Sequence, residues 1–143
     1  MKPSINIFFD DTEILDLDPE FFVSWLSNVC LKEGFVLEEL NFIFCSDDIL
    51  LGINNEFLSH DYYTDVITFN NNVGTNIIGE IYISLDRVIE NAKELKSDFN
   101  DELRRVVVHG VLHLCGFNDQ TLLEIELMRK KENEYLLYVS RET

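Results

Sequence analysis

Two of the three histidines lie four residues apart in the stretch HGVLHLCGFND, residues 109–119. On an α-helix such residues share one face, so His109 and His113 can direct both imidazoles at one ion. A catalytic zinc ion needs a third protein ligand and keeps one position open for water. Gly116 predicts a helix end with a chain reversal, because glycine readily takes the left-handed conformation. Asp119, just past that turn, is the candidate third ligand.

Both histidines and Asp119 also have a purely structural interpretation. The histidines can be core residues satisfied by hydrogen bonds, and Asp119 can cap the helix that follows. Thr121 and Glu124, however, form the T-x-x-E pattern of a capping box, so Thr121 can serve as the cap and leave Asp119 free. The metal site and the structural interpretation both stay open at this point.

Glycine occupies position 110, where H-E-x-x-H metallopeptidases carry the glutamate that acts as general base. The missing glutamate disfavours peptidase activity. Glycine inside a helix also costs about 1 kcal/mol relative to alanine. A close approach of another backbone or of a ligand is a common reason for such a glycine, so we expect Gly110 to lie at one.

Hydrophobic periodicity and turn residues predict the elements around this stretch. Strands are expected at residues 4–9, 40–45, 65–69 and 76–83. Helices are expected from Asp18 and Pro19 to Gly34, from Ser46 to about Leu58, after Ser84, from the cap Asn100 to Gly116, and from about Gln120 to about Val139. This order predicts an α+β fold with a small mixed four-stranded sheet packed with helices. No linker or repeat interrupts the sequence, so residues 1–143 are expected to form one domain.

The composition is strongly acidic. The chain has 143 residues and a formal net charge of −16, and 46% of its residues are hydrophobic. Residues 1–65 hold 14 acidic and 2 basic side chains, whereas residues 66–143 hold 13 acidic and 9 basic ones. Because phosphate binding depends on Lys and Arg, this charge argues against a nucleic-acid partner. A neutral or basic face is expected only in the second part, where the candidates are Arg104, Arg105, Arg129, Lys130 and Lys131.

Cysteine use and the first residues bear on the compartment. The three cysteines (Cys30, Cys45 and Cys115) are widely spaced and form no CxxC pair. We therefore expect reduced thiols, two of them buried, in a reducing compartment. The N-terminal stretch lacks the features of a signal peptide, and no apolar run reaches membrane-spanning length. The sequence thus favours a soluble cytoplasmic protein with no membrane partner.

Several motifs resemble those of one family. HGVLHLCGFND is similar to H-G-x-L-H-L-x-G-[YF]-D-H of the YbeY family, bacterial factors for ribosomal RNA maturation. Upstream, INNEFLSHDYYTDVITF at residues 53–69 resembles the family's L-N-x-x-[YF]-R-x-x-D-x-x-T-D-V-L-S-F-P. The tripeptide at residues 79–81 stands where the family usually has G-D-I. Length, element order and motif order also agree, so the resemblance is specific and covers nearly the whole chain.

The resemblance implies an α+β fold with one zinc ion per chain at the end of the H-x-x-x-H helix. It implies a metal-dependent hydrolase, a single-strand-specific endoribonuclease that matures the small-subunit (16S) ribosomal RNA and acts in ribosome quality control. The implied chemistry is attack of metal-activated water on an RNA phosphodiester. The implied partners are single-stranded ribosomal RNA and the small ribosomal subunit or a protein associated with it.

Two positions depart from the family. The motif's third zinc histidine falls on Asp119, and His, His and Asp is still a workable ligand set. The family arginine thought to face the substrate phosphate falls on Leu58, so His60 becomes the candidate catalytic cation or proton donor. His60 can equally be an exposed loop histidine. Tyr62 can stack on an unpaired base or pack against the protein. Arg105 is a candidate for substrate binding.

Two other classes of function stay open. One is a zinc hydrolase of another substrate, a small molecule or peptide, which the acidic charge suits better than RNA. The other is a non-catalytic, zinc-containing, ribosome-associated factor, which the leucine at position 58 favours. Cleavage of single-stranded RNA that is abolished by a chelator would separate the nuclease from this factor.

Overall fold

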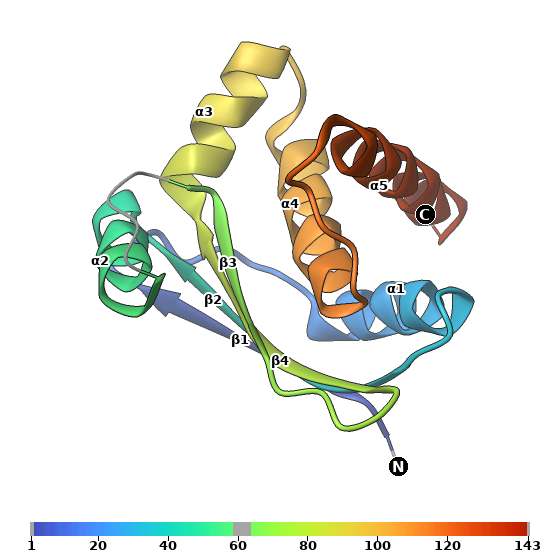
Figure 1. Cartoon of the computed structure of the whole chain (residues 1–143). Coiled ribbons are helices and arrows are strands. Elements are labelled where there is room, and N and C mark those ends of the chain that lie inside the picture. Colours follow the sequence, from blue (N-terminus) through green and yellow to red (C-terminus); the bar gives the residue numbers. More distant parts are fainter. Residues whose placement is uncertain (1, 59–63, 143) are drawn as a thin grey trace.

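Four strands and five helices follow one another in the described chain, residues 2–58 and 64–142 of a computed structural model (Figure 1). They are β1 (Ser4–Asp10), α1 (Pro19–Lys32), β2 (Val36–Cys45), α2 (Asp47–Leu58), β3 (Val66–Asn70), β4 (Asn76–Ser84), α3 (Leu85–Leu95), α4 (Phe99–Leu114) and α5 (Leu122–Glu142). This is the predicted order of elements. None of the helices in these described ranges is both long and apolar enough to cross a membrane.

The strands form one mixed sheet in the order β1-β2-β4-β3. β1, β2 and β4 are parallel, and β3 is antiparallel to β4. The predicted hairpin of β3 and β4 is therefore confirmed, and so is the α+β class with a mixed four-stranded sheet. The two parallel pairs are joined by segments that contain α1 and α2, as parallel strands require a crossover connection.

The two faces of the sheet are covered unequally (Figure 1). α1 and α4 pack on one face, and α5 packs on both of these helices. The core on this side contains fully buried side chains from α1, β2 and α5, among them Trp25, Phe42 and Tyr135. α2 packs on the other face through Leu50 in a smaller cluster. α4 thus has the sheet on one side and α5 on another.

Two glycines allow α4 to lie close to the sheet. A Cβ atom added at Gly110 would lie 2.9 Å from Cγ2 of Ile81 on β4. A Cβ atom added at Gly79 would lie 2.8 Å from the carbonyl oxygen of Phe69 and 2.9 Å from Cδ1 of Leu114. Gly110 does lie at a close approach, but the neighbouring atoms belong to the side chain of Ile81, where another backbone or a ligand was expected.

Two predicted boundaries are wrong. β2 begins at Val36 rather than at residue 40, because backbone before Leu40 already pairs with β4 although its acidic side chains hide the strand pattern. Asn100 is not the cap of α4, because the helix already includes Phe99, which packs against the core, and Asp98 is the cap residue.

All three cysteines are buried and free, where two were expected to be buried.

Candidate metal centre

The end of α4 reverses the chain as the glycine predicts. Gly116 has a φ of +98°, in the left-handed region. The N–H of Phe117 donates to the carbonyl oxygen of Leu112 at 3.0 Å, and the N–H of Gly116 donates to that of His113 at 3.0 Å. These two bonds form a Schellman motif, which satisfies carbonyl groups that the helix leaves open. The turn brings the following residues back beside the histidines.

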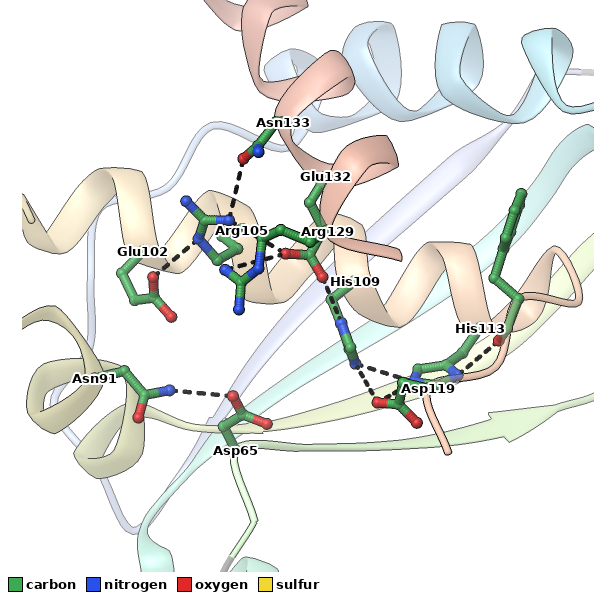
Figure 2. Close-up of polar contacts among 11 residues, drawn as sticks. Asp65, Asn91, Glu102, Arg105, His109, His113, Asp119, Arg129, Glu132 and Asn133 are labelled. Atoms are coloured by element: carbon green, nitrogen blue, oxygen red, sulfur yellow. Dashed lines mark hydrogen bonds and ion pairs between the residues drawn. The ribbon is translucent and has the colours of Figure 1, made fainter. Parts of the chain in front are cut away.

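Hydrogen bonds at Nδ1 orient both imidazoles (Figure 2). Nδ1 of His113 lies 2.9 Å from the carbonyl oxygen of Phe117, and Nδ1 of His109 lies 2.7 Å from Oε2 of Glu132. A carbonyl or carboxylate oxygen accepts, so each Nδ1 carries the proton and each Nε2 is left to bind. The two Nε2 atoms lie 3.0 Å apart and thus point at the same place.

Asp119 completes this group. Its Oδ2 lies 3.2 Å from Nε2 of His109 and 3.4 Å from Nε2 of His113. The next helix does not use Asp119 as its cap. Instead, the N–H of Glu124 donates to Oγ1 of Thr121 at 3.1 Å, and the N–H of Thr121 donates to Oε1 of Glu124 at 2.9 Å. The predicted capping box is confirmed, and it leaves the Asp119 carboxylate with the histidines.

The two histidines differ in their affinity for protons. Burial lowers the pKa of His113, and its neighbour His109 lowers it further. Burial also acts to lower the pKa of His109, but the hydrogen bond and charge of Glu132, helped by Asp65 and Asp119, outweigh it and raise that pKa. His113 therefore favours the neutral form that binds metals. His109 lies in a negative field that attracts a proton or another cation.

The chemistry of this donor set fits a divalent metal ion. Two imidazole nitrogens and one carboxylate oxygen lie within 4.8 Å of one another. Zinc binds such ligands, and two neutral imidazoles with one carboxylate leave a net charge that suits a dication. A further carboxylate, that of Glu132, is buried beside the site and contacts both Arg105 and His109. Its charge favours a cation there.

A cavity of about 420 Å³ adjoins His109 and Asp119. Its wall includes Arg105, whose guanidinium donates to Glu102 at 3.2 Å, to Glu132 at 3.2 Å and to Asn133 at 3.4 Å. Arg105 is therefore beside the site, as a substrate-binding residue must be, but it is already engaged by carboxylates. His60 and Tyr62, the other two candidates, lie outside the described residues.

Sequence reasoning overlooked Glu132 and did not assign Asp65 to the site. Glu132 lies within the charged run RKKENE, which is typical of a solvated helix face. Its position nevertheless follows the buried stripe of α5, four residues after Met128 and three before Tyr135, and this spacing could have revealed it. Asp65 lines the cavity and accepts from Nδ2 of Asn91 at 3.1 Å. Only the fold brings Asp65 near α4.

The family model described as Endoribonuclease YbeY matches residues 8–140. The chain belongs to the YbeY family. A YbeY relative from Amoebophilus asiaticus, named Endoribonuclease YbeY, is 49% identical over 137 residues, which are 95% of this chain and 93% of the relative. Another with the same name, from Cytophaga hutchinsonii, is 47% identical over 138 residues, which are 95% of this chain and 96% of the relative.

A solved structure agrees with this membership. The solution structure of a protein from Thermotoga maritima matches with a TM-score of 0.64 at 30% sequence identity, and the match covers 96% of this chain and 90% of that one. The resemblance to the YbeY family inferred from HGVLHLCGFND is therefore confirmed.

Proposed function

We propose that the protein is a zinc-dependent endoribonuclease that hydrolyses phosphodiester bonds in single-stranded RNA. His109, His113 and Asp119 would hold one zinc ion per chain. The observation that carries this proposal is the convergence of their three donor atoms beside an open cavity. Both YbeY relatives described above are named endoribonucleases, and these names support the same activity.

Zinc bound there would supply Lewis acidity, lowering the pKa of a water ligand and stabilising negative charge on phosphate. The chain's own residues supply the positioning. The Phe117 carbonyl and the Glu132 carboxylate hold the imidazole planes, and Gly110 keeps α4 against the sheet. Asp119 adds a negative charge that a third imidazole would not. A substrate phosphate at Arg105 would have to compete with the carboxylates that this guanidinium already contacts.

The proposed natural substrate is small-subunit ribosomal RNA within the ribosome, and free RNA is expected to be cleaved but to bind weakly. The net charge of −16 opposes binding to phosphate, since that binding depends on basic side chains. A protein of the small subunit would then supply affinity that phosphate contacts do not. In this proposal residues 1–143 act as one cytoplasmic domain, His60 is a proton donor, and Tyr62 stacks on a base. Tight binding of naked RNA at physiological salt would contradict the need for a protein partner.

Cleavage of single-stranded RNA tests the proposed activity. Metal-free protein is loaded with zinc and incubated with single-stranded and fully paired RNAs of the same sequence, with and without a chelator. We expect cleavage of the single strand only, loss of cleavage with chelator, and loss in His113→Ala. Glu126→Gln, an exposed change on α5, is the control and should cleave normally. Zinc binding without cleavage of any RNA would instead indicate the non-catalytic ribosome-associated factor.

A further inference from the structure

α5 carries a carboxylate in its buried stripe. Glu132 is only 4% exposed, between the buried residues Met128 and Tyr135. Burying an ionised carboxylate is strongly unfavourable unless cations and hydrogen-bond donors compensate for the lost water. Its position therefore requires specific partners, and those partners indicate its role.

The two oxygens of Glu132 face different groups (Figure 2). Oε1 lies 3.2 Å from Nη1 of Arg105 and 3.7 Å from Nη1 of Arg129. Oε2 lies 2.7 Å from Nδ1 of His109. Arg105 is itself held by Glu102 at 3.2 Å. Rotation of the Glu132 carboxylate would break contacts on both sides, so this network fixes the acceptor that His109 meets.

Glu132 is placed to orient His109 and not to join the three donor atoms. It binds Nδ1, whereas the metal-facing atom of the ring is Nε2, which lies 3.0 Å from Nε2 of His113. A proton held on Nδ1 leaves the lone pair on Nε2, and the negative charge behind the ring makes that nitrogen a stronger donor. His113 has a neutral carbonyl, that of Phe117, in the equivalent place.

We propose that Glu132 is a positioning residue of the metal centre, which fixes the tautomer and ring plane of His109 and thereby sets the affinity for the metal. This inference rests on the proposed metal site. It assigns to α5, which contributes none of the three proposed ligands, control over how strongly the ion is held. Loss of such a partner typically lowers metal affinity about 10- to 100-fold.

Glu102 provides a matched control. It is as buried as Glu132, at 3% exposed, and it shares Arg105. Glu102 contacts Arg105 and not His109 in the contacts that Figure 2 draws. A change at Glu102 therefore disturbs the same buried ion network without removing the acceptor of His109.

The experiment compares zinc affinity in the full-length wild type, Glu132→Gln and Glu102→Gln. Each protein is stripped of metal, checked for folding by its thermal midpoint, and titrated with Zn²⁺ against a competing chelator. We expect the dissociation constant of Glu132→Gln to rise about tenfold or more, and that of Glu102→Gln to change less than about threefold. With Co²⁺ in place of zinc, the visible absorption spectrum should change in Glu132→Gln and not in Glu102→Gln.

Each outcome decides between defined alternatives. Equal affinities in the two variants would overturn the role of Glu132 and leave the proposed metal site standing. A wild type that takes up neither ion would overturn both. Should Glu132→Gln fail to fold, Glu132→Asp serves in its place, because it keeps the charge for Arg105 but is one methylene shorter toward His109. The zinc affinity of Glu132→Asp should also fall. A folded Glu132→Asp that binds zinc as tightly as the wild type would contradict the proposal.

Discussion

His109 and His113 lie one turn apart on α4, but different parts of the chain hold their rings. His113 bonds to the carbonyl of Phe117, four residues further on, within the turn that Gly116 makes. His109 bonds to Glu132, 23 residues further on, on another helix. The first arrangement forms together with the end of α4, whereas the second exists only after α5 has packed against α4.

The two arrangements also differ in charge. The Phe117 carbonyl is neutral and belongs to the backbone, so no substitution of its side chain removes it. The Glu132 carboxylate is charged, buried and tied to Arg105. In the proposed metal site, the local half (His113 with the Phe117 carbonyl) thus sets where the donor atoms meet. The long-range half (His109 with Glu132) would set how strongly they hold the ion. Each half can be disturbed separately, and Asp119 connects them because it lies near both histidines.

Removing Asp119 should have the largest effect, since it takes away a proposed ligand that both halves share. Residues that hold the ligands without binding the metal change metal affinity by up to about 100-fold. Asp119→Ala removes a proposed ligand, so its zinc affinity should fall more than about 100-fold. Asp119→His, which restores the third histidine of the YbeY motif, should keep zinc. Elemental analysis of protein purified without a metal-affinity tag, followed by chelator competition, measures both.

The control for Asp119 is Glu126→Gln, which changes an exposed carboxylate of α5 that is not among the three proposed ligands. It should retain about one zinc ion per chain. Full zinc content in Asp119→Ala would move the third ligand elsewhere and end the role of Asp119 as the link between the two halves.

Gly110→Ala should disturb both halves at once, because it pushes α4 away from β4. The new Cβ would lie 2.9 Å from Cγ2 of the fully buried Ile81. Overpacking of this kind costs about 1–3 kcal/mol, and alanine returns about 1 kcal/mol in helix propensity. We therefore expect a net loss of up to about 2 kcal/mol in the free energy of unfolding, measured with urea.

Gly52→Ala is the matched control for Gly110→Ala, since Gly52 lies inside α2 with no atom within 4 Å of an added Cβ. There the gain in helix propensity is unopposed and should stabilise the protein by up to about 1 kcal/mol. Stabilisation by Gly110→Ala would show that α4 is not held as closely as the contact with Ile81 requires.

The local half of the centre is the part that sequence reasoning could predict. The spacing of the histidines, the turn at Gly116 and the capping box at Thr121 all depend on residues within a few positions of one another. Such patterns report local conformation directly, and they predicted that Asp119 lies beside the histidines. Most helix and strand positions were predictable for the same reason.

The long-range half was not predictable, because it depends on how elements distant in sequence pack. Glu132 resembles its solvated neighbours until α5 is known to bury that face, and Asp65 approaches His109 only through the order of strands in the sheet. The first residues of β2 were missed for a related reason. The backbone of Val36, Leu37 and Glu39 pairs with β4, whatever the polarity of Glu38 and Glu39.

Gly116→Ala should have the smallest effect and tests the local half alone. Alanine at a φ of +98° is strained by about 1 kcal/mol, and the turn carries the acceptor of His113 and the path to Asp119. We therefore expect the free energy of unfolding to fall by about 1 kcal/mol and zinc affinity to fall severalfold. Urea unfolding and chelator competition measure the two quantities on the same preparation.

Gly34→Ala separates strain from position in this test. Gly34 follows α1 with a φ of +87°. Alanine there should lower the free energy of unfolding by about as much as Gly116→Ala does, without changing the proposed metal site. If both variants lose equal stability and only Gly116→Ala loses zinc affinity, the turn positions the donor atoms as well as ending the helix. Unchanged affinity in Gly116→Ala would instead mean that packing of α5 alone is enough to bring His109, His113 and Asp119 together, and the distinction between a local and a long-range half would fail.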